Sequence, residues 1–266
     1  MRDDYWKINQ FGKTPKLNKP VFIEGLPGIG NVGKVAVDFL IDELKAKKLY
    51  EITSYTFPHS VFVNEDNLVE LPIVEVFYKQ FSNKTDLLLL GGDVQPIDEV
   101  SSYEFSEKVL DLIEKFKSRE IITLGGIGLA DIPKKPKVYC TGNTKKIIGK
   151  YKDEMISNNL YGVVGPIVGV SGLLLGLASR RGIDAVSLLA ETYGHPMYLG
   201  IKGAKEILKV LNKKLSLNLD INKLDKEIKD IESEIMKKTE QLSEVTKQIA
   251  LKKLQKKLGR DVDYIG

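Results

Sequence analysis

Short apolar runs alternate with segments of helical periodicity along most of the chain. Val21–Ile23 and the run DLLLLGGD at 86–93 are typical of buried strands. Between them, apolar positions from Val32 to Leu44 recur at three- and four-residue spacing, which predicts an amphipathic helix. A second helix is predicted after Ser101 and Glu104, whose S-x-x-E spacing is typical of a capping box.

The pattern continues with further strand-like runs and one more helix. Two of these runs, at 50–57 and 68–78, have no helix between them and form a β-rich interval. Four others follow, EIITLGGIG, VYCTGN, YGVVG and IDAVSLLAET, and a helix is predicted at 202–215. Strands that alternate with helices predict an α/β fold with a mainly parallel sheet covered by helices.

The character of the chain changes after Leu219, where a heptad pattern begins. No Gly or Pro occurs between Ile221 and Gly259, and apolar residues recur in a narrow stripe that includes Ile228, Ile231, Ile235 and Leu242. We predict an α/β domain at 1–218, a helical, coiled-coil extension at 219–258 and a flexible tail at 259–266. The extension either packs on its own domain or forms a helical hairpin or intersubunit contact. The narrow stripe favours the second interpretation.

Charge and composition limit the classes of function. The net charge of +4 is too small to indicate nucleic-acid binding. A single cysteine, Cys140, allows no disulfide within the chain, and two histidines exclude a three-histidine metal site. The run from Leu160 to Ala178 is uncharged, but its five glycines and Pro166 favour a buried strand–turn–helix over a membrane span. With no signal peptide at the N-terminus, a cytoplasmic protein without a membrane anchor is expected.

The stretch GLPGIGNVGK at 25–34 resembles two nucleotide-binding motifs. Gly28, Gly30 and Gly33 have the G-x-G-x-x-G spacing, and Gly28 to Lys34 matches most of a P-loop. However, Val35 stands where a P-loop has the Ser or Thr that holds magnesium, and no carboxylate ends the second strand. These departures favour a turn that lets a helix pack close to a strand, with an anion or nucleotide pocket as the alternative.

Glycines gather where four predicted strands end, which is where open α/β sheets bind ligands. The candidate residues of such a crevice are Gly28, Gly30, Gly33 and Ser171, with polar side chains at its rim from Asp93, Asp131, Glu191 and His195. The sequence around Ser171 lacks the second glycine of a hydrolase elbow, so Ser171 is predicted to cap a helix. No nucleophile–base pair or metal cluster is evident, and we predict no catalytic residue, cofactor or metal.

The segments GLPGIGNVGK, DLLLLGGD, TLGGIG, GPIVGVSG and LLAETYGHP occur in an order that resembles the archaeal form of the PAC2 family of proteasome assembly chaperones. The resemblance covers residues 15–215. It implies a fold similar to nucleoside phosphorylases and a non-catalytic, homo-oligomeric chaperone or activator of the core proteasome. The alternative is an enzyme, either an ATP-grasp-like ligase or a nucleoside-processing enzyme, that uses the glycine-lined crevice.

The resemblance also implies a way of binding the proteasome core particle. Relatives dock through a C-terminal tail of the form hydrophobic residue, Tyr, any residue, which enters pockets between α-subunits. In this chain the resemblance points to Tyr264, Ile265 and Gly266. Tyr264 is third from the end rather than second, and Asp263 precedes it where an apolar residue is expected. The tail therefore docks in a shifted register, packs elsewhere or binds a different partner.

Overall fold

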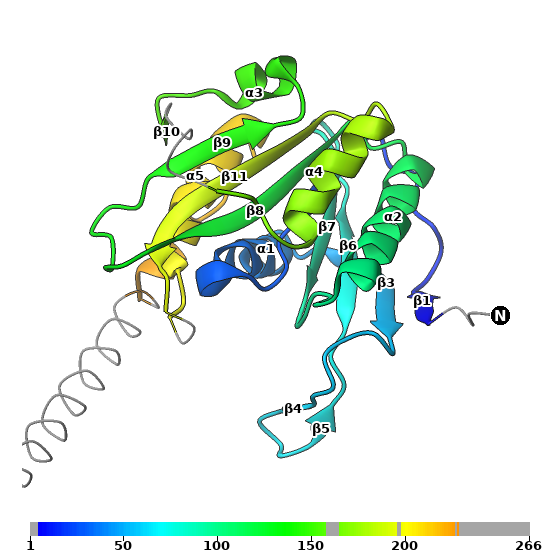
Figure 1. The fold of residues 1–266 in the computed structure, drawn as a ribbon. Coiled ribbons are helices and arrows are strands. Elements are labelled where there is room, and N and C mark those ends of the chain that lie inside the picture. Colours follow the sequence, from blue (N-terminus) through cyan, green and yellow to red (C-terminus); the bar gives the residue numbers. More distant parts are fainter. Residues whose placement is uncertain (1–4, 158–164, 196–197, 227, 229–266) are drawn as a thin grey trace, which may run out of the picture. The chain divides into compact units, whose positions relative to one another are not determined.

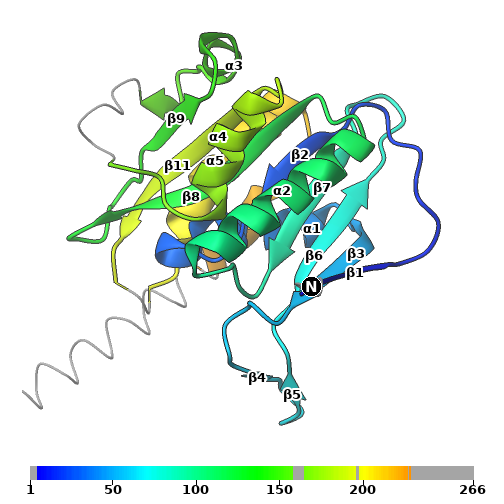
Figure 2. The same cartoon turned by 45° about the vertical axis from the view of Figure 1, so that its right-hand side comes forward.

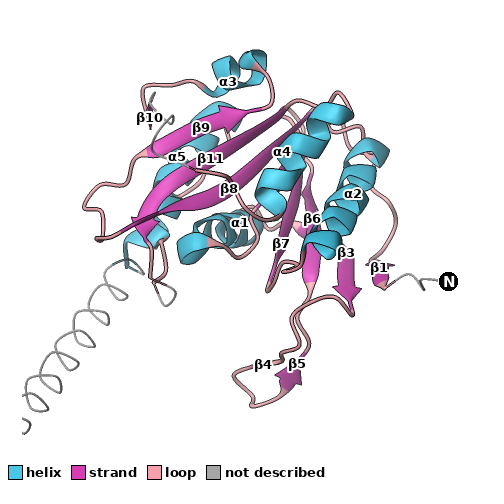
Figure 3. Cartoon of the chain, viewed as in Figure 1, coloured by secondary structure: helices cyan, strands magenta, loops and turns pink. Residues whose placement is uncertain are grey.

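The computed structural model describes residues 5–157, 165–195, 198–226 and 228. The chain divides into two units, Met1–Ile221 and Asn222–Gly266. The first unit holds a large sheet flanked by helices, and Figure 1 and Figure 3 show its arrangement. The described part of the second unit begins in a short 3-10 helix, η2 (Ile221–Lys223), and continues as helix through residues 224–226 and 228.

The strands of the main sheet are β1 (Trp6–Gln10), β2 (Val21–Glu24), β3 (Lys47–Ser54), β6 (Val74–Lys79), β7 (Leu87–Gly92), β8 (Glu120–Leu129), β9 (Val138–Gly142), β10 (Ile156–Ser157) and β11 (Ala185–Tyr193). They lie in the order β1-β3-β6-β7-β2-β8-β11-β9-β10. The helices are α1 (Val32–Glu43), α2 (Glu99–Lys115), α3 (Lys145–Tyr151), α4 (Val170–Arg180) and α5 (Ile201–Leu215), with a 3-10 turn, η1 (Ile29–Asn31), before α1.

The sheet is mixed, so the prediction of a mainly parallel sheet is wrong. Parallel pairing joins β7, β2, β8 and β11 at its centre. Antiparallel pairing joins β1 to β3, β3 to β6, β6 to β7 and β11 to β9. For the pairs β3–β6 and β6–β7 the reason lies in the β-rich interval, because strands that follow one another without a crossover helix pair antiparallel.

Helices cover both faces of the sheet. Helices α2 and α4 lie together on one face, and α1 and α5 lie on the other (Figures 1 and 2). The central strands β2 and β7 are buried at every position because both of their faces are covered, which explains the apolar run of β7 and the three apolar residues that begin β2. The predicted helix at 202–215 is confirmed as α5, which buries one apolar face.

The start of α2 differs from the predicted capping box. The N-cap is Asp98, whose carboxylate accepts a hydrogen bond of 3.0 Å from the backbone N–H of Ser101. Ser101 therefore lies in the first turn of the helix, and Glu104 instead accepts a hydrogen bond of 3.2 Å from the indole of Trp6. A carboxylate at the N-cap also complements the positive end of the helix dipole.

A small hairpin projects from the sheet between β3 and β6. Its strands are β4 (Phe62–Val63) and β5 (Val69–Glu70), and they form a separate two-stranded sheet. Both ribbon views show the hairpin extending beyond the ends of β3 and β6 (Figures 1 and 2).

Candidate functional site

A cavity of about 1100 Å³ opens at the carboxyl ends of the parallel strands. Turns and loops that follow β2, β7 and β11 contribute to its wall, together with β8 itself and the N-terminus of α4. All four residues predicted for a ligand crevice, Gly28, Gly30, Gly33 and Ser171, line this cavity. The strand ends therefore meet as expected for an open α/β sheet.

The glycine-rich turn between β2 and α1 is held by close backbone contacts. Gly30 has φ +60°, and a Cβ there would lie 2.6 Å from Oγ1 of Thr192. A Cβ on Gly33 would lie 2.3 Å from the carbonyl oxygen of Leu124. At these two positions a side chain is excluded by the packing of α1 against β8 and β11.

Lys34 does not line the cavity in the way a P-loop lysine would. Its ammonium group lies 3.0 Å from the carboxylate of Asp38, one turn further along α1, and 4.0 Å from that of Asp93. Asp93 also accepts a hydrogen bond from the backbone N–H of Ile73. Lys34 and Asp93 thus join α1 to the end of β7 and lie outside the cavity lining.

A buried carboxylate that the sequence patterns did not single out, Glu24, lies at the end of β2. Glu24 has no solvent exposure, and burial raises its pKa from 4.5 to about 7. It accepts hydrogen bonds from the backbone N–H of Leu26 at 3.0 Å and from the hydroxyl of Ser171 at 2.8 Å. The available sequence signal was a carboxylate that ends an otherwise apolar strand.

Ser171 was predicted as a helix cap, and that prediction is wrong. The N-cap of α4 is Gly169, which has φ +86° and no side chain with which to cap the helix. Ser171 lies in the first turn and uses its hydroxyl to bind Glu24 instead. The helix start is fixed by Gln95, whose side chain accepts from the N–H of Val170 at 3.1 Å and donates to the carbonyl of Pro27.

The remaining polar candidates are spread around the sheet edge. His195 lines the cavity, and its ring stacks on that of Tyr193. Glu191 lies outside the lining, where it accepts hydrogen bonds of 2.9 Å from the hydroxyl of Tyr139 and from the backbone of Lys137. Asp131 is exposed in the loop after β8. Of the four predicted rim residues, only His195 therefore belongs to the described lining of the cavity.

The chemistry of the cavity is limited by what surrounds Ser171. A nucleophilic serine needs a base within hydrogen-bond reach and a third group that orients that base. Glu24 meets the distance requirement, but its second oxygen is bound to the backbone of Leu26 within the core. Among the described residues, no group of three metal-ligating side chains occurs and no helix could cross a membrane.

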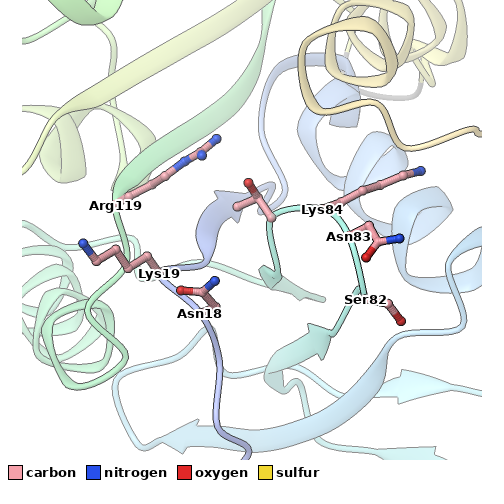
Figure 4. Close-up of a pocket in the computed structure, with 7 residues that line it drawn as sticks. Asn18, Lys19, Ser82, Asn83, Lys84 and Arg119 are labelled. Atoms are coloured by element: carbon pink, nitrogen blue, oxygen red, sulfur yellow. The ribbon is translucent and has the colours of Figure 1, made fainter.

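A second hollow lies at the opposite edge of the sheet, next to the start of β2, β7 and β8. It has a volume of about 490 Å³ and carries Lys19, Lys84 and Arg119. Figure 4 shows these three side chains pointing in different directions. The guanidinium of Arg119 also lies 3.3 Å from the carboxylate of Glu120. The hollow therefore does not present a converging set of cations to an anion.

Most residues of the predicted contact seam and the whole predicted tail lie outside the described residues. Ile228 is described, and it is helical and half-buried. Ile231, Ile235 and Leu242 of the seam, and Tyr264, Ile265 and Gly266 of the tail, are not described.

Fold and site together define an α/β protein with a mixed central sheet and a glycine-lined cavity at its carboxyl edge. The model of the PAC2 family matches residues 22–239, so the chain belongs to the PAC2 family. An uncharacterized protein of Methanocaldococcus jannaschii is 32% identical over 221 residues, which cover 83% of each chain.

Two solved structures from Pyrococcus furiosus are also similar. The first, PbaB, is described as an archaeal proteasome activator. It is 36% identical, with a TM-score of 0.80, and the match covers 90% of this chain and all of PbaB. The second, PbaA, is described as an archaeal homolog of proteasome-assembly chaperone. It is 25% identical, with a TM-score of 0.72, over 92% of this chain and 97% of PbaA.

Proposed function

We propose that this protein is a non-catalytic assembly chaperone or activator that binds the proteasome core particle. The observation that carries the proposal is the similarity to PbaB, which extends over the whole length of that activator at 36% identity. A match of this extent covers the whole domain rather than a single motif. The similarity to PbaA, named as a chaperone homolog, supports the same class of function.

Binding without catalysis agrees with the cavity. Its glycines allow close backbone packing, and its buried carboxylate is joined to β2, α4 and the core by hydrogen bonds. Among the described residues that line it, the cavity has no ordered nucleophile, base and orienting group of a hydrolase. In this proposal the cavity mainly fixes the arrangement of α1 and α4.

The proposal assigns proteasome docking to the C-terminal tail and self-association to the helical extension. Tyr264 supplies a rigid aromatic anchor, Ile265 an apolar contact and the Gly266 carboxylate a charge-assisted one at the α-subunits. The seam of Ile228, Ile231, Ile235 and Leu242 joins copies in a homo-oligomer through coiled-coil packing. We also propose that the protein is cytoplasmic and that its α/β core is similar to nucleoside phosphorylases. The α/β domain would end at residue 218 and the helical extension at residue 258.

An affinity measurement against proteasome α-rings tests this function. The full chain is passed over immobilised α-rings, and we expect saturable binding. The matched control is a chain shortened by Asp263–Gly266, which we expect to bind more weakly while keeping its fold. A chain that binds no α-ring at any concentration would contradict the proposal.

The alternative function is a small-molecule or nucleotide-binding enzyme that uses the cavity. The observation in its favour is the direct 2.8 Å contact between Ser171 and a carboxylate with a pKa near neutrality. A thermal-shift screen with nucleotides and nucleosides tests it, because a ligand at 100 times its Kd adds about 2.7 kcal/mol to stability.

A further inference from the structure

The β4–β5 hairpin exposes an unusual amount of apolar surface. Six of its side chains are 44–72% exposed, namely Val61, Phe62, Val63, Leu68, Val69 and Leu71. Phe62 pairs with Glu70 and Val63 with Val69, so apolar groups lie on both faces of a two-stranded sheet. A patch of this kind on a projecting element marks a surface that binds another protein.

The tip of the hairpin keeps its shape through its own hydrogen bonds. The side-chain oxygen of Asn64 accepts from the backbone N–H groups of Asp66 and Leu68, at 3.1 and 2.9 Å. Its amide donates to Glu70 at 2.7 Å, and Asn67 takes the left-handed conformation with φ +60°. Such a turn is prepared for binding and loses little conformational freedom when it docks.

The hairpin is also acidic in a chain that is basic overall. Residues 49–78 contain no Lys or Arg but hold five carboxylates, whereas the whole chain has a net charge of +4. Two of the five, Glu51 and Glu75, lie in β3 and β6 of the main sheet, where both pair with Lys48. Glu65 and Asp66, at the tip, have no cationic partner among the described residues. A surface complementary to the hairpin is therefore one that carries apolar and basic side chains.

The loop between β8 and β9 has that chemistry. Its sequence at 131–137, DIPKKPK, exposes Ile132 beside Lys134, Lys135 and Lys137. These three ammonium groups have no carboxylate partner within the described part of the chain. Pro133 and Pro136 restrict the backbone, and Lys137 is fixed to Glu191 by a backbone hydrogen bond of 2.9 Å. The loop is thus a stiff cationic counterpart to the hairpin.

Within one molecule the two elements do not meet. The hairpin follows β3, whereas the loop follows β8, and the strands β6, β7 and β2 lie between them in the sheet. Figures 1 and 2 show the hairpin and the loop well separated in both views. A contact between them therefore joins one copy to the next, and such a head-to-tail contact closes into a ring when its rotation fits.

We infer that the β4–β5 hairpin of one copy docks on the β8–β9 loop of a second copy, joining acidic and apolar groups to basic and apolar ones. This inference deepens the self-association included in the proposed function and is independent of proteasome binding. It assigns to the α/β body an interface separate from the C-terminal seam.

Charge reversal tests the inference in the full chain. One variant carries Glu65→Lys and Asp66→Lys in the hairpin, and the other carries Lys134→Glu and Lys135→Glu in the loop. A third variant combines all four changes, which restores opposite charges in inverted order. The control, Lys13→Glu with Lys16→Glu, alters two exposed lysines elsewhere. Molar mass is measured by light scattering after size exclusion, with circular dichroism as the test of folding.

We expect the wild type and the control to share one oligomeric mass and each two-residue variant to have a lower one. The combined variant should recover most of the lost mass, because it remakes the attraction. A monomeric wild type, or a hairpin variant of unchanged mass, would overturn the inference. A mass lost in the hairpin variant but not recovered in the combined one would also overturn it and assign the hairpin to another partner.

Discussion

The hydroxyl of Ser171 donates a hydrogen bond of 2.8 Å to the carboxylate of Glu24, across 147 positions of sequence. The bond joins the end of β2 to the first turn of α4, which lies on the face of the sheet that also carries α2. Glu24 is fully buried, and each of its two oxygens accepts one hydrogen bond, from the Ser171 hydroxyl and from the N–H of Leu26. Stability should therefore depend on the protonation of Glu24.

The first prediction concerns pH. Burial raises the pKa of Glu24 from 4.5 to about 7, so the folded state holds a proton that the unfolded state has released between these values. This contribution to stability is fully present below pH 4.5 and is lost as the pH rises through 7. Its full extent is about 3 kcal/mol. Urea unfolding of the wild type and Glu24→Gln from pH 4.5 to 8 measures it.

Glu24→Gln should remove this dependence because the amide stays neutral. The variant should be as stable as the wild type or less so at pH 4.5, and more stable at pH 8. Glu99→Gln, at an exposed position, serves as the control and should follow the wild type. Parallel pH profiles for the wild type and Glu24→Gln would contradict the assignment.

A second prediction separates two glycines of the same turn. Gly30→Ala should destabilise the protein by about 1–3 kcal/mol, because φ +60° is strained for alanine and its Cβ would meet Thr192 at 2.6 Å. Gly30→Val should be worse, since its methyl groups need further space. Gly28→Ala is the matched control, because no atom lies within 4 Å of its Cβ. Equal unfolding free energies for Gly30→Ala and Gly28→Ala would show that the turn tolerates both.

Much of the fold and the glycines of the cavity follow from sequence patterns, whereas the contact between Glu24 and Ser171 does not. The strand β7 and the helix α5 are predictable because an uninterrupted apolar run and a helical stripe each have one simple structural solution. The antiparallel pairing of β3 with β6 was indicated by the missing helix between residues 50 and 78. Glu24 and Ser171 meet only through the packing of α4, so no local spacing contains their contact.

The start of helix α2 shows how a local sequence signal can be misleading. Ser101 and Glu104 have the spacing of a capping box, but Asp98 caps α2 three residues earlier. The carboxylate accepts the N–H of Ser101 itself, which leaves the serine inside the helix. The spacing of Ser101 and Glu104 predicted the wrong start: a cap at Ser101 would satisfy N–H groups of residues 103–104, whereas Asp98 satisfies that of Ser101.

The third prediction concerns Lys34, which the P-loop resemblance would make essential. Its partners are Asp38 and Asp93 at the surface of α1 and β7, and partly exposed pairs of this kind contribute less than about 1 kcal/mol. We therefore expect Lys34→Ala to keep both thermal stability and partner binding. Calorimetry with ATP provides the contrary test: tight binding by the wild type that disappears in Lys34→Ala would reinstate a nucleotide site.

The fourth prediction addresses the contact seam predicted for the C-terminal extension. Ile231→Asp with Ile235→Asp should weaken self-association, because a docked seam would have to bury unpaired charges. Light scattering should show a lower mass, while circular dichroism should show that the α/β body stays folded. The control is an exchange of Lys229 and Lys237 to Gln, which leaves the apolar stripe unchanged. An unaltered mass in the aspartate variant would remove the seam from the interface.

A fifth prediction assigns docking to the tail. Deleting Asp263–Gly266 should leave fold and oligomer intact, since these residues follow both the α/β body and the predicted seam. Binding to α-rings should weaken. Replacing the last residues so that an apolar residue precedes a penultimate tyrosine should strengthen it. Equal binding by the full and shortened chains would move docking to the extension or the α/β body.

Surface plasmon resonance on immobilised proteasome α-rings tests the central claim most directly. The analyte is the full chain, with serum albumin as the protein control and rings blocked at the pockets between α-subunits as the surface control. The proposed function predicts saturable binding of the full chain to open rings and reduced binding to blocked ones. No difference between the full chain and albumin on open rings would contradict a proteasome-associated role.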